Sequence, residues 1–547
     1  IGMQKNTTKI WLGLILAAAF LLRFIGLGSD ELIFDEGLYA FRSIGYLDYL
    51  ESPYQTTPIQ WFAPGDYKRT IPSESEGLPT WTHLSFHDHP PLFFLVQHMF
   101  FKIFKDSLFV SRLPSALFGL ASVYLIYLIA SKLINERAGL ISAFIFAVSF
   151  VHTSVSRLAM MESVLFLFVL LNIYYFLKLL EDRKHWAGFG ITLGLAFLTK
   201  YVAVFLIPTY FIFLIISRRD ILRDRRLYYG FFITAVVFSP VIIYNIQSYK
   251  TFGHFDLQLA YLLGQKTPWP VNEFGGKTQD PLSHIWENLT AVFSLPFLIT
   301  STAGLGLAMF KKDLRKKLLL MFLVFLFIAL LLTQTGSAVR FTALYIIPFT
   351  FFVGALFIYL YGKKPKMALA IFILLAAHEL FFTAERVFIN PPDYGVAKLD
   401  RYFDSVFKNG RPQNQPSHPN LILNNVIETY SAQYPVTLGP TGLVFDDNLA
   451  TGPMLWLFSR RQYYHGVPIM TASNFNQIIR HENSVALNGF TLYFVKTDSG
   501  APLKPTTPTD YATDLENLLI KNGETPNIII KSGDGSSAFR VYKFSVK

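Results

Sequence analysis

Long apolar stretches separated by short polar connections fill the first two thirds of the chain. A helix needs roughly 20 predominantly apolar residues to cross a bilayer, and about eleven stretches approach that length, with a range of eleven to thirteen. The pattern therefore predicts an α-helical multispan membrane domain over residues 3–386. The predicted spans are 10–28, 110–132, 138–156, 160–180, 186–200, 201–217, 228–247, 288–310, 318–335, 341–361 and 367–385.

Lysine and arginine residues gather in the connections between these stretches and indicate which side each connection faces. Cytoplasmic connections of membrane proteins carry an excess of both residues. With eleven crossings, every basic connection falls on the cytoplasmic side, and the outer face holds residues 29–109 and the chain from about 386 onward. The basic connections are Lys5 with Lys9, Lys132 with Arg137, Arg183 with Lys184, Arg218 to Arg226, Lys311 to Lys317, and Lys363 to Lys366.

The same charge pattern decides two doubtful stretches. Residues 186–217 are long for one span, but a single crossing would place Arg218 to Arg226 outside, so two short spans meeting near Lys200 are predicted. Residues Pro90 to Phe104 are apolar enough for a span, yet one more crossing would reverse the side of every later connection. We expect this stretch to form a helix that lies on the outer surface.

The composition changes near Pro391, and no predicted span follows. Short β-like runs such as 490–495 and 539–544 alternate with helix-like stretches such as 510–521. This alternation predicts a soluble, mixed α/β domain over residues 387–547. We expect this domain on the extracytoplasmic side, either selecting the acceptor of a reaction or serving as a structural cover.

Composition supports the membrane class and excludes several kinds of site. The 547 residues are 52% hydrophobic and 16% charged, with a mean hydropathy of +0.37, which is typical of a multispan membrane protein. The net charge of +11 comes from the connections, so it indicates topology and not nucleic-acid binding. The chain has no cysteine, which excludes disulfides, thiolate nucleophiles and cysteine metal ligands.

Two adjacent carboxylates, Asp35 and Glu36, follow the first predicted span by a few residues. Charges that meet both lipid and water are usually functional. The alternative is that the pair caps a surface helix and favours its positive end.

A second acidic motif, His87-Asp88-His89, ends the first outer loop. Imidazole and carboxylate groups are common metal ligands, so a divalent metal is possible here. No third or fourth ligand is visible, however, and the following prolines favour a turn that sets the entry into the next helix. The sequence therefore predicts no certain metal or cofactor.

Other outer connections contribute further charges. Arg157 and Glu162 flank one short connection, Lys200 lies where two predicted spans meet, and Arg340 opens another span. Separate connections on one face thus supply carboxylates and cations, as a site for an anionic lipid head group needs. The alternative is that these cations snorkel to the interface, as lysine and arginine often do near span ends.

Together with Asp35-Glu36, four motifs carry a resemblance to a known family: His-Pro-Pro-Leu at 89–92, Arg-Leu-Pro-Ser-Ala-Leu-Phe-Gly at 112–119, Ser-Arg-Leu at 156–158 and Leu-Thr-Lys at 198–200. In this order and spacing they resemble integral-membrane glycosyltransferases of the C fold, in particular the protein O-mannosyltransferase and lipid A aminoarabinose transferase group. The resemblance covers roughly residues 8–215. The second acidic position is usually aspartate in this family and is Glu162 here.

The resemblance implies transfer of a single sugar from a polyprenyl-phosphate donor to an acceptor hydroxyl outside the cytoplasmic membrane, with inversion. The acceptor is a lipid, a glycan or a protein, and the membrane is most simply a prokaryotic inner membrane. Asp35 is then the expected base, and Glu36 a structural or sugar-orienting partner. Glu162 is a third catalytic candidate, which positions the sugar or the acceptor or serves as a second base. Cations near the departing phosphate stabilise the transition state, and the expected ones are Lys200, Arg340 and Arg157.

The outer loop 248–287 is polar, aromatic and rich in glycine and proline. Long loops in compact proteins are often lids or binding loops, so Tyr261 or Trp269 can be expected to contact the substrate. His87 and His89 are further expected substrate contacts. The alternative is an ordinary connector.

Two other functions are compatible with parts of the pattern. An oligosaccharyltransferase would share the fold, but the string Asp393-Tyr394-Gly395 lacks the tryptophans of the oligosaccharyltransferase signature. A transporter of a lipid-linked or anionic solute would more often show repeated halves and charges near the bilayer midplane, whereas here the charges gather on one face. The favoured hypothesis is the glycosyltransferase.

Overall fold

The computed structural model of the chain describes residues 5–33, 35–46, 79–265, 282–407, 410–417, 421–480, 487–504 and 510–546. These residues form two compact units. The helical unit contains residues 1–27, 80–96 and 109–390, and the sheet unit contains residues 28–79, 97–108 and 391–547. Parts of the first outer loop belong to the sheet unit, and the domain bounds 3–386 and 387–547 stay a prediction.

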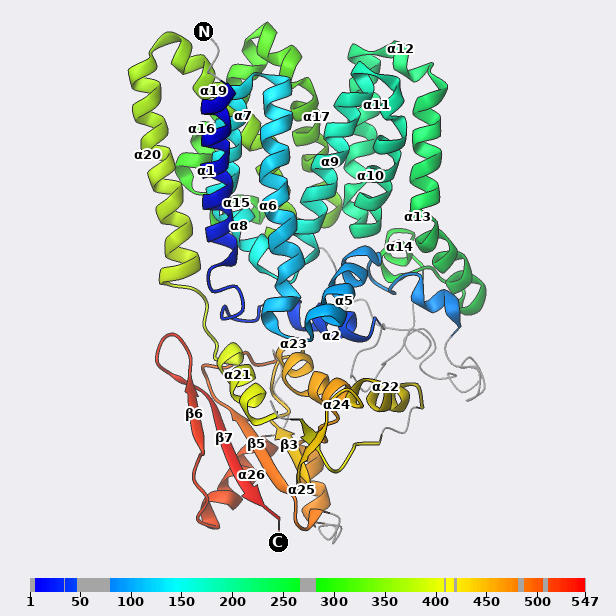
Figure 1. Cartoon of the computed structure of the whole chain (residues 1–547), viewed down its shortest axis with the longest axis vertical. Helices are drawn as coiled ribbons and strands as arrows, with labels where there is room; N and C mark the ends of the chain where they lie inside the picture. Colours follow the sequence, from blue (N-terminus) through cyan, green and yellow to red (C-terminus); the bar gives the residue numbers. More distant parts are fainter. Residues whose placement is uncertain are drawn as a thin grey trace. The chain divides into compact units, whose positions relative to one another are not determined.

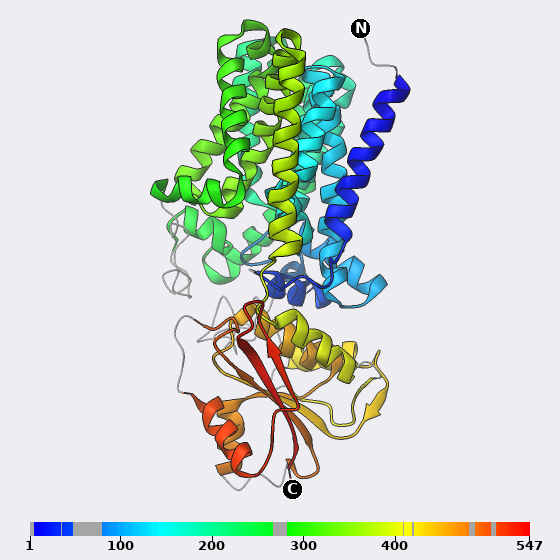
Figure 2. The ribbon, with the colours of Figure 1, turned by 90° about the vertical axis from the view of Figure 1, so that its left-hand side faces the viewer.

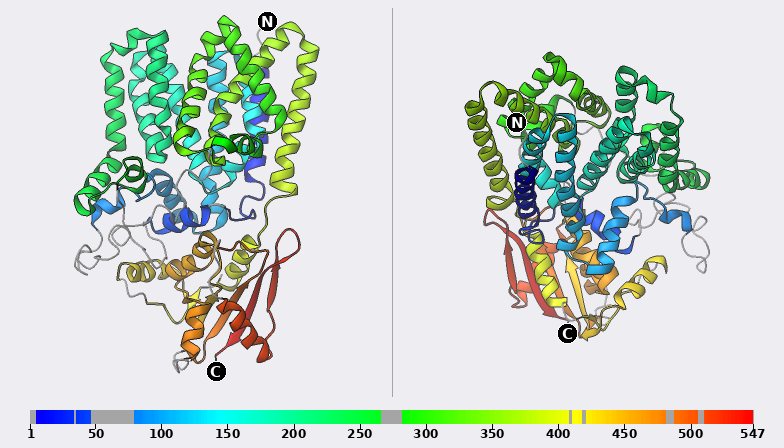
Figure 3. Two further views of the ribbon diagram at one scale, coloured as in Figure 1. Left: turned by 180° about the vertical axis from the view of Figure 1, so that it is seen from behind. Right: turned by 45° about the horizontal axis from the view of Figure 1, so that its top comes forward.

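The helical unit is a bundle whose long helices run roughly side by side (Figures 1 and 3). Its α-helices are α1 (Lys5–Phe24), α6 (Leu108–Leu133), α7 (Glu136–Val148), α8 (Phe150–Arg157), α9 (Met161–Glu181), α10 (Trp186–Thr199), α11 (Leu206–Ser217), α12 (Arg219–Leu222), α13 (Arg225–Phe252), α14 (Leu257–Leu262), α15 (Ile285–Val292), α16 (Leu295–Phe310), α17 (Lys312–Thr335), α18 (Val339–Thr342), α19 (Ile346–Lys363) and α20 (Pro365–Ala384). Short 3-10 turns are η1 (Thr80–His83), η2 (Arg183–His185), η3 (Tyr201–Phe205), η4 (Leu282–His284) and η5 (Ala343–Tyr345), and a π turn, η6 (Glu385–Ile389), follows α20.

Within the described residues, seven helices are long and apolar enough to cross a membrane, or nine if each of two bent helix pairs counts as one span. The bent pairs are α7 with α8, at 57°, and Leu282–Val292 with α16, at 113°. The two other predicted spans, 186–200 and 201–217, correspond to α10 and to Tyr201–Ser217, which are shorter than the rest. The predicted α-helical multispan fold is confirmed.

The stretch 90–104, predicted not to cross, contains helix α5 (Leu92–Phe104). Its 13 residues give a length of about 20 Å at 1.5 Å per residue. This is shorter than a hydrocarbon core of about 30 Å, but α10, with 14 residues, is about as short, so length alone does not show whether α5 crosses.

Glycines bring helix α10 into close contact with helix α13. A Cβ atom on Gly190 would lie 2.2 Å from the carbonyl oxygen of Gly230, so no larger residue fits there without moving a backbone. Thr234 Oγ1 donates to the Gly190 oxygen at 3.1 Å across the same contact. Small residues allow such close helix packing in membranes. The contact fixes α10, and with it the residues that follow its C-terminal end.

The sheet unit is built on a five-stranded sheet in the order β4-β3-β5-β7-β6. Strand β3 pairs in parallel with β4 and β5, and β7 pairs antiparallel with β5 and β6. All five residues of β3 are buried, as expected for a strand covered on both faces. The strands are β3 (Thr441–Phe445), β4 (Ile469–Thr471), β5 (Thr491–Thr497), β6 (Ile528–Lys531) and β7 (Ser537–Ser545), and a separate parallel pair is formed by β1 (Arg411–Pro412) and β2 (Val436–Leu438).

Helices cover both faces of this sheet (Figure 2). On one face, Leu515 packs in a core with Phe494 of β5. On the other face, the ring of Phe403 lies 6.4 Å from that of Tyr493, the neighbour of Phe494 along the strand. The predicted mixed α/β C-terminal domain is therefore confirmed. Its helices are α21 (Val396–Phe407), α22 (Leu421–Ser431), α23 (Thr451–Met454), η7 (Leu455–Ser459), α24 (Arg460–His465), α25 (Ala472–Arg480) and α26 (Tyr511–Lys521), and the unit also holds α2 (Glu36–Gly45).

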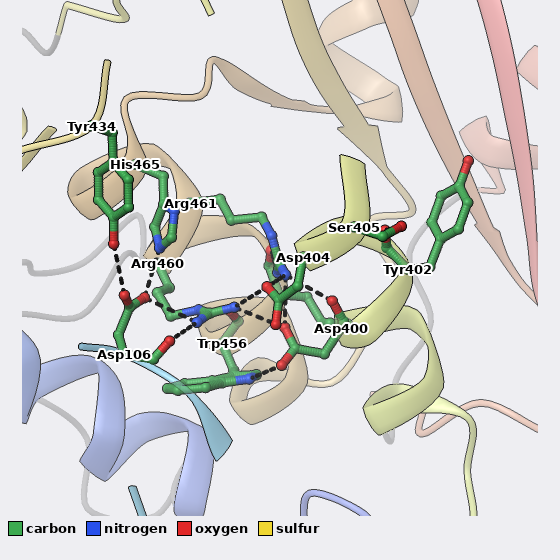
Figure 4. Close-up of polar contacts among 11 residues, drawn as sticks. Asp106, Asp400, Tyr402, Asp404, Ser405, Tyr434, Trp456, Arg460, Arg461 and His465 are labelled. Atoms are coloured by element: carbon green, nitrogen blue, oxygen red, sulfur yellow. Dashed lines mark hydrogen bonds and ion pairs between the residues drawn. The ribbon is translucent and has the colours of Figure 1, made fainter. Parts of the chain in front are cut away.

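Asp106 ties the segment 97–108 into the sheet unit through a buried ion network (Figure 4). Its Oδ2 lies 2.9 Å from Arg460 Nη1 and 2.6 Å from His465 Nε2, and Tyr434 donates its hydroxyl to Oδ1 at 2.9 Å. Burial alone would raise the pKa of Asp106. The charges of His465 and Arg460 outweigh burial and hold that pKa well below its usual range.

The network continues into helix α21. Arg460 Nη2 lies 2.8 Å from Asp400 Oδ1, and Arg461 Nη2 lies 2.6 Å from Asp404 Oδ1. Trp456 Nε1 donates to the second oxygen of Asp400 at 2.9 Å. Both arginine side chains are buried, and a buried charge without a partner would cost several kcal/mol. The paired carboxylates therefore allow this charged centre to exist inside the unit.

Replacing Asp106 with alanine should destabilise the sheet unit, because breaking a buried ion pair costs about 3–5 kcal/mol. We expect Asp106→Ala to lower the melting temperature of the purified chain in detergent at pH 7, measured by circular dichroism. Since the folded-state pKa of Asp106 lies below the unfolded one, its stabilisation is complete above about pH 4 and declines as the pH falls through the folded-state pKa.

The matched control is Asp514→Ala, at an exposed position of α26. Equal melting temperatures for the two variants at pH 7 would contradict the stabilising role of the network.

Candidate functional site

A buried ion pair between Glu162 and Lys200 is the centre of the candidate site. Lys200 Nζ lies 2.6 Å from Glu162 Oε1, and only 11% and 4% of the two side chains are exposed. Glu162 lies in the first turn of α9, where the helix dipole favours a negative charge. Lys200 lies in the extended residue between α10 and η3, where the helical path is interrupted. This break lets the lysine side chain reach the start of α9.

The second oxygen of Glu162 has an unusual environment. Oε2 is buried and accepts no hydrogen bond from any residue that the structure describes. Buried polar atoms nearly always have a partner, and leaving one without a partner costs about 1–3 kcal/mol. This oxygen is therefore available to accept a hydrogen bond from a hydroxyl group of a ligand.

Arg340 joins the pair from helix α18. Both cations lie near the ring of Phe341. Lys200 Nζ is 5.3 Å and Arg340 Cζ is 5.2 Å from the centre of that ring. The positive charge of Arg340 also acts on the Glu162 carboxylate. The structure thus brings together three predicted site residues that are far apart in the sequence. The roles assigned to them stay predictions.

Arg157 is held at the end of α8 by contacts with two other helical elements. Its Nη1 donates to the carbonyl oxygen of Leu22 at 2.9 Å, and its Cζ lies 5.1 Å from the ring centre of Phe388. Near it, Arg23 is fully buried and bonds His152 Nδ1 at 2.6 Å. Arg23 and His152 were not predicted from the sequence, although ionisable residues inside a predicted span are a signal that could have found them.

The His87-Asp88-His89 segment forms a turn before helix α5. His89 Nδ1 lies 3.1 Å from Asp88 Oδ1, and the backbone N–H of Phe86 donates to the His89 oxygen at 3.2 Å. His87 is buried, and its carbonyl oxygen accepts from the Leu257 N–H at 2.6 Å. Among the described residues, no group of three or more histidine and acidic side chains could hold a metal ion. Substrate contacts by His87 and His89 stay predictions.

Asp256 connects the outer loop after α13 to the Lys200 break. Its Oδ2 accepts from Tyr201 OH and from Asn245 Nδ2, both at 2.7 Å, and its side chain caps helix α14. Burial raises the pKa of Asp256. On the same helix, Tyr261 is partly exposed, and Trp269 lies outside the described residues. Their contact with substrate stays a prediction.

Asp35 and Glu36 lie in the sheet unit, at the start of α2. The Asp35 side chain makes no capping hydrogen bond; Tyr39 OH donates to its Oδ2 at 3.4 Å. Glu36 is buried and accepts from the Ile33 N–H at 3.1 Å, which is a local structural bond. Asp35 is nevertheless the N-cap residue of α2, and Glu36 lies in its first turn, so the alternative interpretation of a pair at the positive end of a helix stays open. The catalytic role of Asp35 stays a prediction.

Glu31 anchors the segment that leads to Asp35. Its carboxylate accepts backbone N–H groups of Tyr394, Val396 and Ala397 at 2.8, 3.1 and 3.0 Å, at the start of α21. Burial raises the pKa of Glu31, although these hydrogen bonds oppose the shift. The sequence carries no local signal for this bond, because its partners lie more than 360 residues away.

The string Asp393-Tyr394-Gly395 is a structural turn before α21. Asp393 Oδ1 accepts from the Gly395 N–H at 3.1 Å, and its Oδ2 lies 2.6 Å from Lys398 Nζ. These local bonds give the aspartate a role in forming the turn, which agrees with the incomplete match to an oligosaccharyltransferase signature.

Comparison with known protein sequences finds relatives among mannosyltransferases. A family model described as dolichyl-phosphate-mannose-protein mannosyltransferase matches residues 88–244. A curated protein of Bacillus subtilis (strain 168), named "Putative mannosyltransferase YycA", is 29% identical over 141 residues, which are 25% of this chain and 21% of the relative. The matched part thus spans about a fifth of the length of that curated relative.

Two solved structures resemble most of the chain. ArnT from Cupriavidus metallidurans bound to undecaprenyl phosphate has a TM-score of 0.57 at 14% identity, covering 97% of this chain and 98% of that chain. The archaeal oligosaccharyltransferase AglB from Archaeoglobus fulgidus, in complex with an inhibitory peptide and a dolichol-phosphate, has a TM-score of 0.51 at 12% identity, covering 85% and 64%. The predicted resemblance is confirmed: the chain is an integral membrane protein with the C fold of membrane glycosyltransferases.

Removing one partner of the Glu162–Lys200 pair should leave an uncompensated buried charge, at a cost of about 3–5 kcal/mol. We expect Lys200→Met to lower the melting temperature in detergent, and the double variant Glu162→Gln with Lys200→Met to regain most of the loss. Lys184→Met, in an exposed pair with Asp182, is the control and should change little. A double variant no more stable than Lys200→Met would contradict the pairing.

Proposed function

We propose that this chain transfers a single sugar from a polyprenyl-phosphate donor to an acceptor hydroxyl, with inversion at the anomeric carbon. The observation that carries this proposal is the buried Glu162–Lys200 pair with Arg340 beside it. The combination offers two cations for a phosphate and one open carboxylate oxygen for a hydroxyl. The acceptor is a lipid, a glycan or a protein.

Lys200 and Arg340 bind the donor phosphate in this proposal. As the bond between the anomeric carbon and the phosphate oxygen breaks, the departing phosphate gains negative charge. Cations fixed in a site from which most water is excluded stabilise that charge more in the transition state than in the bound donor, so they raise turnover as well as affinity. An ammonium carries three N–H donors, so Lys200 can hold Glu162 and a phosphate oxygen together. Arg157 is a third cation for the same lipid phosphate.

Glu162 orients the sugar. Its Oε1 is held by Lys200, which fixes the carboxylate plane, and its Oε2 accepts a hydrogen bond from a sugar hydroxyl. A buried carboxylate oxygen that loses its hydroxyl donor is left without a partner, so this contact selects sugars that carry a hydroxyl at the matching position.

Asp35 is the proposed base. The acceptor oxygen gives its proton to the Asp35 carboxylate and forms a bond to the anomeric carbon. At the same time the bond from that carbon to the phosphate oxygen breaks, and polyprenyl phosphate leaves with the electron pair. Attack from the face opposite the phosphate inverts the anomeric carbon. Glu36, buried and bonded to the backbone, holds the turn that presents Asp35.

We place the reaction on the extracytoplasmic face of the cytoplasmic membrane. The basic connections indicate which face of the bundle is cytoplasmic, and the Glu162–Lys200 pair lies at the opposite ends of the helices that these connections join. The sheet unit, which carries Asp35, is then extracytoplasmic.

The direct test is product formation in membranes that contain the purified chain and a polyprenyl-phosphate sugar. Asp35→Asn should lower turnover by about 10²–10⁴-fold, the usual effect of losing a general base, while donor binding persists. Mass spectrometry identifies the added sugar. Asp514→Asn, at an exposed position of the same unit, should keep wild-type turnover.

The alternatives give different results in that assay. Transfer from a lipid-linked oligosaccharide would add the mass of a whole glycan instead of one sugar. A transporter would move its solute whether or not residue 35 can accept a proton, so unchanged flux in Asp35→Asn without any glycosylated product would overturn the transferase proposal.

A further inference from the structure

The contacts of Asp256 assign a role to residues outside the predicted site. We propose that Asp256 is a positioning residue that sets the Lys200 ammonium against Glu162, acting through Tyr201. The part of this inference that concerns the donor phosphate rests on the proposed function. The positioning itself concerns only the geometry of the Glu162–Lys200 pair.

The helical path is broken at Lys200. Lys200 has an extended backbone, with α10 ending before it and the 3-10 turn η3 beginning at Tyr201. An extended residue between two helical segments can be rotated by small changes in either neighbour, and its side chain then moves by several ångströms. On one side of the break, α10 is fixed by its close contact with α13. On the other side, the Ala203 N–H donates to the Lys200 oxygen at 3.2 Å, and Tyr201 is the residue of η3 that adjoins Lys200.

A hydrogen bond between Tyr201 and Asp256 constrains the start of η3. Tyr201 OH donates to Asp256 Oδ2 at 2.7 Å, and its ring lies 6.1 Å from that of Phe238 in an edge-on contact. Asp256 is fully buried. A buried acceptor that loses its donor is left without a partner, which is unfavourable, so this bond can hold the first residue of η3 in one orientation.

Asp256 is itself held in place by neighbouring groups. Asn245 Nδ2 donates to the same Oδ2 at 2.7 Å, and Asn245 Oδ1 accepts the Asp256 backbone N–H at 2.8 Å. Asp256 Oδ1 accepts the Leu259 N–H at 3.0 Å as the cap of α14. The carboxylate is thus fixed by groups on two helices, α13 and α14. Such a fully satisfied buried network is rigid.

The network also reaches the first outer loop. The N–H of Leu257, the residue after Asp256, donates to the carbonyl oxygen of His87 at 2.6 Å. The Asp256 carboxylate thus connects the Lys200 break, α13 and the outer helix α14, and the backbone of the next residue adds the turn before α5. A change in α14 is expected to reach the Lys200 ammonium through Tyr201, which gives this outer loop a role in assembling the donor site.

Two conservative variants test the proposal. Tyr201→Phe removes the hydroxyl and keeps the ring that contacts Phe238. Asp256→Asn keeps the shape, but an amide has only one oxygen, so it cannot both cap α14 and accept from Tyr201 and Asn245. The matched control is Tyr210→Phe in helix α11. It also removes a buried tyrosine hydroxyl, which donates to Asn172 Oδ1 of helix α9 at 2.7 Å.

The first measurement is the rate at which a small amine-reactive reagent labels Lys200 of the full chain in detergent. The labelled chain is analysed by mass spectrometry. A lysine held by a buried carboxylate reacts slowly, because the reagent needs an amine that is released from its partner. We expect Tyr201→Phe and Asp256→Asn to raise the Lys200 labelling rate by about three- to tenfold, as the loss of one strong hydrogen bond implies. Tyr210→Phe should leave the rate unchanged, and thermal unfolding checks that all variants are folded.

The second measurement is binding of undecaprenyl phosphate. If both test variants are labelled faster and bind the lipid about tenfold more weakly than Tyr210→Phe, the positioning and the donor site are both supported. If labelling rises but no protein, including wild type, binds the lipid, the positioning stands and the proposed function fails. The inference would be overturned if folded Tyr201→Phe and Asp256→Asn were labelled at Lys200 no faster than the wild type.

Discussion

The ion pair between Lys200 and Glu162 is the interaction on which the candidate site depends. Each partner alone would be a buried charge that costs several kcal/mol, and only their close approach at 2.6 Å makes both tolerable. The pair joins the start of α9 to the break after α10, and Arg340 adds a second positive charge from α18. Apolar side chains of similar volume at such positions often give a protein equal or greater stability.

The rest of the helical unit can be understood as support for this pair. Gly190 and Gly230 let α10 and α13 approach closely, and the Asp256 network then fixes the residue that follows Lys200. The sheet unit performs the corresponding task for Asp35. There Glu31 binds the start of α21. In each unit, the buried polar groups that hold the fold also hold the segments that carry these charged side chains.

Much of the fold could be predicted from the sequence, because spans are local features. Apolar runs, basic connections and alternating short elements predicted the helical bundle and the α/β domain. Charges at span ends predicted Glu162, Lys200 and Arg340 as site residues, and the structure brings these three together while their roles stay predictions. The bends between α7 and α8 and before α16 could not be predicted, since an apolar run looks the same whether it is straight or broken. Asp106, Glu31 and Asp256 were assigned no role for a different reason. Their significance lies in partners that are distant in sequence or on another helix, and no periodicity records such pairs.

The central claim is that Lys200 and Arg340 receive the phosphate of a lipid-linked donor beside Glu162. The most direct test is a structure of the purified chain with undecaprenyl phosphate, determined by electron cryomicroscopy in lipid nanodiscs. The account predicts the phosphate within about 4 Å of the Lys200 ammonium and the Arg340 guanidinium, the usual range of an ion pair. A phosphate bound elsewhere, with the Lys200–Glu162 pair untouched, would contradict it.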